Sequence, residues 1–272
     1  MLHVSFVTAY PPDRGRLSEY AEALIEALSE RGLKATVYSD SLGGGGRTVA
    51  VKPSWAPDRP FSLLTLPFKL LRDRPSIVHF NIHFAVFGRS RLSNFLGFLA
   101  LGAVNLLKRL FHVRTVVTLH NLPEAIKLEH VNVKPSLLNK LGFLVAEKLS
   151  TLCDRVVVHS RLYQRLLEER FKRRVDRVPH GSWSLAPSTA GVSRDSIMFI
   201  GYLSPAKDLE VLKEAFLKLR SKYPWLRLLL STSPHPNFPE TLEQLAALRG
   251  VEGVEVLGYV PNEALPGPLA KC

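Results

Sequence analysis

The chain opens with a strand, a turn, a helix and a second strand in immediate succession, and this order constrains the fold more than any other feature. Residues 2–9 are apolar and rich in β-branched and aromatic side chains, which predicts a buried strand. Residues 17–31 carry apolar side chains at helical spacing, Gly32 follows them, and residues 35–39 predict the next strand. Strands joined through a helix favour a parallel sheet with crossover helices.

The same alternation continues along the chain, which predicts an α/β protein. Further strands are predicted at residues 48–51, 77–81, 114–119, 155–160, 175–179, 197–200, 226–230 and 254–257. Helices are predicted at residues 61–72 (kinked at Pro67), 93–110, 135–152, 161–171, 209–219 and 240–249.

A segment rich in Ser, Ala, Pro and Gly divides the chain. We interpret residues 182–195 as a hinge between an N-terminal domain, 1–181, and a C-terminal domain, 196–272. Two prolines and a glycine within residues 265–272 are expected to break the helix that would begin there. With three strands and two helices, the second domain is predicted to be an incomplete nucleotide-binding sheet.

The net charge is unevenly distributed. The chain carries a formal charge of +12, and the whole excess lies in residues 1–190, because residues 191–272 contain equal numbers of basic and acidic side chains. Such a field attracts anionic partners such as lipid headgroups, a lipid-linked phosphate or nucleic acid. A solvated basic surface that aids solubility is the alternative. A nucleic-acid partner is disfavoured, since no recognition module accompanies the charge.

Cysteine content and hydropathy indicate a cytoplasmic protein. Two cysteines cannot form a disulfide framework, and no secretory signal precedes the first strand. The longest apolar run, residues 95–107, is too short to span a bilayer. The helix predicted around it either packs against the sheet or presents a membrane-facing or acceptor-facing patch, since basic residues flank it: Arg89, Arg91, Lys108, Arg109 and Arg114.

A strand, a glycine turn and a helix start predict an anion site in the second half of the chain. The strand ends at Gly201, and Asp208 is positioned to cap the following helix. Unpaired backbone N–H groups and the positive helix end would face a bound anion, and Lys207 adds a full positive charge. A phosphate-bearing ligand fits this pattern, although any α/β protein can contain such a turn.

In the first half, His120 and Asn121 directly follow a predicted core strand. In open α/β sheets, ligands bind outside the carboxyl ends of the strands, so this pair is well placed for a site. A histidine at a strand end can also be purely structural.

Several other chemistries are disfavoured. The sequence lacks G-x-S-x-G, G-K-[ST], H-E-x-x-H and D-x-D motifs, and the glycine run at 41–46 does not lead into a helix. His79 and His83 alternate with Asn81 on a strand, but no third ligand converges on them in the sequence. We therefore expect neither a metal site nor a cofactor.

Several of these turns together resemble the GT-B glycosyltransferases of family 4. The segment 201–208, Gly-Tyr-Leu-Ser-Pro-Ala-Lys-Asp, resembles the family's G-R-L-S-x-x-K-G donor turn, with Tyr202 and Asp208 at the arginine and second glycine positions. The segment 10–16 resembles Y-P-P-x-x-G-G, with Gly15 and then Arg16. The segment 116–121 resembles V-x-T-x-H-D/N, and His180-Gly181 resembles the P-N-G turn.

The resemblance covers about residues 2–262 and implies two Rossmann-like domains with parallel sheets facing a cleft. It implies a retaining, metal-independent transfer of a sugar from a nucleotide-sugar to a glycan or lipid-linked acceptor, with peripheral membrane contact. Donor-binding residues would be Gly15, Arg16, Gly201, Tyr202, Lys207 and Asp208. His120 would face the sugar, and Asn121, His180 and Gly181 would line the cleft and hinge.

The alternative hypothesis is a chain without catalysis. The family's E-x7-E pair, which grips ribose and sugar, is not found after residue 262. The chain would then be a truncated product or one half of a split enzyme that needs a second polypeptide.

Overall fold

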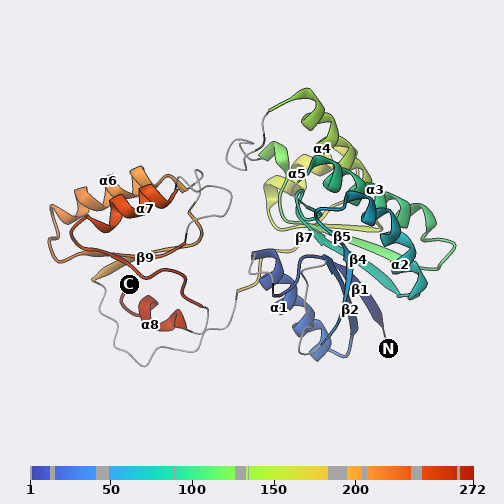
Figure 1. Ribbon diagram of the computed structural model, residues 1–272, viewed down its shortest axis with the longest axis horizontal. Coiled ribbons are helices and arrows are strands. Elements are labelled where there is room, and N and C mark those ends of the chain that lie inside the picture. Colours follow the sequence, from blue (N-terminus) through green and yellow to red (C-terminus); the bar gives the residue numbers. More distant parts are fainter. Residues whose placement is uncertain are drawn as a thin grey trace. The chain divides into compact units, whose positions relative to one another are not determined.

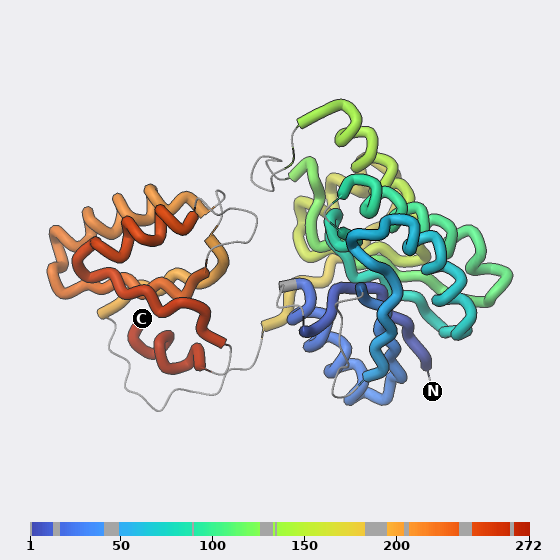
Figure 2. Tube along the Cα trace, in the orientation of Figure 1, coloured from blue at the N-terminus to red at the C-terminus, as the bar shows by residue number. Residues whose placement is uncertain are grey.

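A computed structural model of the chain describes residues 2–12, 16–40, 49–88, 90–125, 133, 135–182, 195–203, 207–233, 241–261 and 264–272. The chain divides into two compact units, and each is described here by itself. The first contains residues 1–128 and 134–180, and the second contains residues 129–133 and 181–272. Figure 2 follows the succession of elements from the N-terminus to the C-terminus.

The first unit is built on a seven-stranded sheet in which every pair of neighbours is parallel. The order across the sheet is β3-β2-β1-β4-β5-β6-β7. Strands β1 to β3 are added toward one edge and β4 to β7 toward the other, so the point where the strand order switches lies between β1 and β4. This is the doubly wound arrangement that places ligands at the carboxyl ends of strands. The strands are β1 (His3–Val7), β2 (Lys34–Asp40), β3 (Ala50–Trp55), β4 (Ile77–Ile82), β5 (Arg114–Leu119), β6 (Arg155–Val158) and β7 (Asp176–Arg177).

Helices connect these strands and cover both faces of the sheet. Figure 1 shows α1 on one side of the sheet and α2, α3 and α4 on the other. A helix able to cross a lipid bilayer is not found among the described residues. The helical elements are α1 (Arg16–Glu30), η1 (Pro60–Thr65), α2 (Leu66–Arg72), α3 (Arg91–Leu107), η2 (Pro123–Ala125), α4 (Leu137–Ser150) and α5 (Arg161–Phe171).

Strand alternation separates the core into two apolar layers. One layer joins Val4, Phe6 and Val37 of the sheet to Ala21 and Ile25 of α1. The larger layer packs α2, α3 and α4 against the opposite face, where the alternate residues of β4 and β5 lie. Because successive side chains of a strand point to opposite faces, β1 contributes Val4 and Phe6 to one layer and Val7 to the other.

The second unit repeats the architecture on a smaller scale. Its three strands pair in parallel in the order β10-β9-β8. Phe216 and Leu209 of the first helix pack on Leu228 and Leu230 of the central strand. Its elements are β8 (Ser196–Ile200), α6 (Leu209–Arg220), β9 (Arg227–Ser231), α7 (Thr241–Arg249), β10 (Val254–Val256) and α8 (Pro266–Leu269).

The structure corrects three expectations at prolines. The segment 61–72 is not one kinked helix, because a 3₁₀ helix, η1, precedes α2 and Pro67 lies in the first turn of α2. Pro53 lies within β3, which is tolerated because β3 is at the edge of the sheet. Pro266 and Pro268 do not prevent a helix: they lie in the four-residue α8, where first-turn N–H groups need no intrahelical acceptor. The described part of the second unit therefore has three helices rather than two.

Some sequence-based predictions fall on residues outside the described ranges. Gly15 and the glycine run at 41–46 are among them, as is most of the proposed hinge, residues 183–194. The exact domain boundaries therefore stay a prediction.

Two helical glycines provide a matched test of packing in the first unit. A Cβ on Gly97 of α3 would lie 2.1 Å from the Cδ2 atom of Phe87, whose ring is fully buried. A Cβ on Gly142 of α4 would meet no atom within 4 Å. We expect Gly97→Ala to lower the free energy of unfolding by about 1–3 kcal/mol through overpacking. Gly142→Ala should raise it by up to about 1 kcal/mol through helix propensity. Urea denaturation of both variants measures the difference, and equal effects would contradict this packing.

Candidate functional site

Histidines follow the carboxyl ends of four successive strands in the first unit. His83, His120 and His159 come directly after β4, β5 and β6, and His180 lies just after β7. Because these strands are parallel, their carboxyl ends meet at one edge of the sheet. The topology therefore gathers residues that are distant in sequence.

A hydrogen-bonded chain fixes the orientation of His120. Its Nε2 atom lies 2.8 Å from the Oδ1 atom of Asn81, and the Nδ2 atom of Asn81 donates to the Oγ1 atom of Thr8 at 3.1 Å. Since an amide oxygen can only accept, Nε2 of His120 carries the proton and donates it. The Nδ1 atom of His120 is then the ring nitrogen with a free lone pair.

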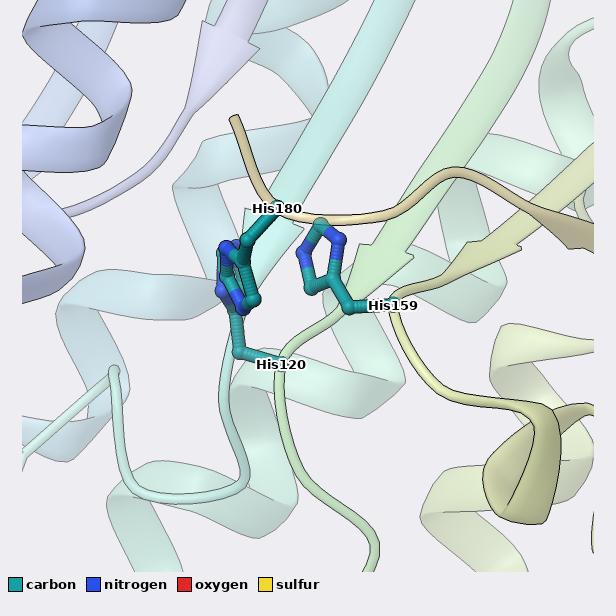
Figure 3. A group of neighbouring side chains, drawn as sticks. All are labelled: His120, His159 and His180. Atoms are coloured by element: carbon teal, nitrogen blue, oxygen red, sulfur yellow. The ribbon is translucent and has the colours of Figure 1, made fainter. Parts of the chain in front are cut away.

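His159 and His180 stack beside His120, as Figure 3 shows. The ring centroids of His159 and His180 are 3.7 Å apart, and those of His120 and His159 are 4.6 Å apart. Tyr20 of α1 packs its ring edge-on against all three imidazoles. The Nδ1 atom of His159 lies 2.8 Å from the carbonyl oxygen of Val178, so this nitrogen is the protonated one.

Burial keeps two rings of this cluster, His120 and His159, uncharged near pH 7. It lowers the pKa of His120 to about 3, with smaller contributions from neighbouring histidines, of which His159 is the largest. Burial also lowers the pKa of His159, against the opposing effect of its hydrogen bond to Val178. Both rings are therefore neutral near pH 7 and present a lone pair rather than a positive charge.

The other N-domain candidates have more modest environments. Asn121 accepts a hydrogen bond from the backbone N–H of Phe84 at 3.1 Å, which positions the turn after β4. Arg16 begins α1, one helical turn before Tyr20. Gly181 directly follows His180 and is exposed. Thus the structure brings His120 and His180 together and gives Asn121 a structural role beside them.

The predicted anion site lies in the second unit. Gly201 directly follows β8 with a φ of +131°, a backbone conformation that favours glycine, and Tyr202 comes next. Lys207 is exposed, and Asp208 caps α6 by accepting a hydrogen bond from the N–H of Val211 at 3.3 Å. The predicted cap is confirmed. The carboxylate of Asp208 takes one of the helix N–H groups that a bound anion would use.

Two further histidines, His79 in β4 and His83 directly after it, make contacts that support the local structure. The Nε2 atom of His79 lies 2.8 Å from the Oγ1 atom of Thr118, and its ring packs against Phe6. The Nδ1 atom of His83 accepts a hydrogen bond from the N–H of Ala85 at 3.1 Å. Asn81, between them, is the residue of this trio that reaches the cluster.

Sequence reasoning overlooked His159, Tyr20 and Asn81 as site residues. The sequence pattern places His159 near the end of the strand predicted at residues 155–160, and the rule applied to His120 applies equally to it. Tyr20 lies within the helix predicted at residues 17–31, and only the three-dimensional packing reveals that its ring faces the histidines.

This doubly wound first unit and the smaller parallel second unit define the class: the chain has the GT-B fold of glycosyltransferases. The model of the Glycosyltransferase Family 4 matches residues 17–181, which include the whole histidine cluster. The chain belongs to this family. No curated protein matches it.

Solved structures agree with this fold at low sequence identity. Sucrose-phosphate synthase from Thermosynechococcus elongatus superposes with a TM-score of 0.69 at 16% identity, covering 99% of this chain and 73% of that one. The catalytic domain of starch synthase IV from Arabidopsis thaliana, bound to ADP and acarbose, gives 0.59 at 13% identity, covering 100% and 76%. An α-glucosyltransferase solved with UDP and a DNA 13-mer gives 0.56 at 11% identity, covering 100% and 70%.

Burial of His79 predicts how stability depends on pH. Burial lowers the pKa of His79 to about 4, so the unfolded chain binds this proton more readily than the native chain. The stabilisation is therefore present at neutral pH and is lost as the pH falls below about 6.5 toward 4, by about 2 kcal/mol between pH 7 and pH 5. His79→Gln should remove this share of the pH dependence. Urea denaturation at both pH values tests it, and an unchanged slope in the variant would refute the assignment.

Proposed function

We propose that the chain is a retaining glycosyltransferase that moves a sugar from a nucleotide-sugar to an acceptor. The observation that supports this most is the cluster of His120, His159 and His180 with Tyr20, within the region that matches the family. The cluster lies where open α/β sheets bind their ligands. The neutral nitrogens of His120 and His159 suit hydroxyl groups better than phosphates.

His120 would orient the sugar. Its Nε2–H is engaged with Asn81, so Nδ1 is left to accept a hydrogen bond from a sugar hydroxyl. A buried neutral imidazole with one tautomer costs little reorganisation on binding, which favours positioning of the reacting sugar.

The second unit would hold the diphosphate. Lys207 is an exposed cation one residue before the cap of α6, and it would stabilise the charge that grows on the leaving diphosphate. Gly201 and Tyr202 would form the adjoining turn.

We expect Lys207→Ala to weaken nucleotide-sugar binding by about 10- to 100-fold, because a charge-assisted hydrogen bond is lost. Lys218→Ala is the matched control, since Lys218 is also exposed but lies in the last turn of α6. Isothermal titration with UDP-, ADP- and GDP-sugars measures affinity, and release of nucleoside diphosphate measures turnover. Equal effects of the two substitutions would argue against a phosphate contact at Lys207.

The same assay distinguishes the alternative in which the chain needs a second polypeptide. That hypothesis predicts donor binding without turnover by this chain alone. Turnover with retention of anomeric configuration, followed by NMR of the product, supports the proposed transfer and removes the alternative.

For the acceptor, we propose a lipid-linked anion at a membrane surface. Four neighbouring helical elements of the first unit expose large apolar side chains: η1, α2 and α4 each pack on α3. The basic excess of residues 1–190 supplies attraction to anionic headgroups. The exposed apolar residues are Phe61, Leu64, Phe68, Leu92, Phe95, Leu99, Leu106, Leu137, Leu138, Leu141, Leu144 and Val145.

Vesicle flotation tests this surface. The protein should float with phosphatidylglycerol vesicles and much less with phosphatidylcholine vesicles, because both charge and apolar burial contribute. Leu137→Ser with Leu141→Ser on α4, whose side chains are 74% and 52% exposed, should reduce flotation severalfold. Leu242→Ser on α7, 55% exposed, is the control. Loss of flotation in the control alone would contradict the assignment.

A further inference from the structure

We propose that His120, His159 and His180 form a binding site for a transition-metal ion of the Zn²⁺ class. Each ring offers one nitrogen, and these three atoms lie within 4.8 Å of one another. The rings come from the ends of β5, β6 and β7, and Figure 3 shows them grouped together. Nothing in the family match assigns an ion to these residues.

The hydrogen bonds around two of the rings are those expected of metal ligands. Metal-binding histidines characteristically donate their other ring N–H to a carbonyl or carboxylate, which fixes the tautomer. His159 donates to the backbone carbonyl of Val178, and His120 donates to the amide oxygen of Asn81. Each ring thus retains one nitrogen with a lone pair.

One of these nitrogens is a buried acceptor without a partner. The Nε2 atom of His159 is shielded from solvent and makes no hydrogen bond. Leaving a buried polar atom unsatisfied is unfavourable, and such atoms are rare in folded proteins. A metal ion would satisfy this atom directly.

The donor set selects the kind of ion. Three imidazole nitrogens with no carboxylate among them favour Zn²⁺, Ni²⁺ or Cu²⁺ over Mg²⁺ and Ca²⁺, which prefer oxygen. Three histidines leave a fourth position open to water or another ligand. Zinc–nitrogen bonds of about 2.0–2.1 Å require the three nitrogens to move closer together. The exposed His180 is the side chain best placed to move.

Metal binding should also oppose sugar binding, a consequence that rests on the proposed function. An ion that occupies the lone pair of His120 removes the acceptor proposed for a sugar hydroxyl. Saturating Zn²⁺ should therefore inhibit turnover, whereas binding of the ion itself does not depend on any activity.

The direct test uses the full chain, freed of metal with a chelator, in a Cys272→Ser background that removes the exposed thiol. Titration with Zn²⁺ against a chromophoric chelator should give one tight site per chain. Titration with Co²⁺ should give the strong visible absorption of a four-coordinate site. His180→Asn should weaken Zn²⁺ binding at least about tenfold.

The matched control is His112→Asn. His112 is exposed but precedes β5, at the opposite end of that strand, and its φ of 52° is a conformation that asparagine tolerates. Absence of a one-to-one site, or a site weakened by His112→Asn and not by His180→Asn, would overturn the proposal. His159→Gln checks the second ligand and should also weaken binding.

The outcomes that would reject the metal site differ from those that would reject the proposed function. Zn²⁺ binding that depends on His180 but does not slow turnover keeps the metal site and rejects the sugar-orienting role of His120. Turnover without any Zn²⁺ binding rejects the metal site alone.

Discussion

Parallel pairing of the strands is the constraint on which the rest of the first unit depends. In a parallel sheet with crossover helices, every strand presents its carboxyl end at the same edge. Leu119 is paired with Ile82 on one side and Val158 on the other, so the residues after these positions emerge together. Backbone hydrogen bonding, rather than any local motif, therefore brings His120 and His159 side by side.

Burial then determines what the cluster can do. A buried imidazole without a carboxylate partner is more stable uncharged, and Tyr20 supplies apolar contact in place of charge. Asn81 connects His120 to Thr8, the residue directly after β1. The tautomer of His120 therefore depends on the pairing of β1 with β4. The buried Nε2 of His159 has no hydrogen-bond partner, which destabilises the folded chain. A ligand or ion bound to this nitrogen would remove the destabilisation.

The fold was largely predictable from the sequence because period-2 and period-3.6 apolar patterns report directly on burial. The predictions that failed concern prolines whose position in the fold makes their missing N–H unimportant. Pro53 is tolerated at a sheet edge, and Pro266 at a helix start, since neither position needs the missing N–H. His120 was found because it follows a core strand, whereas the contacts of His159 and Tyr20 depend on strand register and helix packing, which local sequence does not encode.

The helix start in the second unit shows how one residue can shift the balance of an anion site. The positive end of a helix favours a nearby negative charge by about 0.3–1 kcal/mol when exposed. The carboxylate of Asp208 already occupies that end of α6 and accepts the N–H of Val211. A diphosphate arriving there would compete with this carboxylate and gain little from the helix. Its attraction to the second unit would then depend mainly on Lys207. A glycine in place of Asp208, as in the family's donor turn, would leave the helix N–H groups open to the diphosphate.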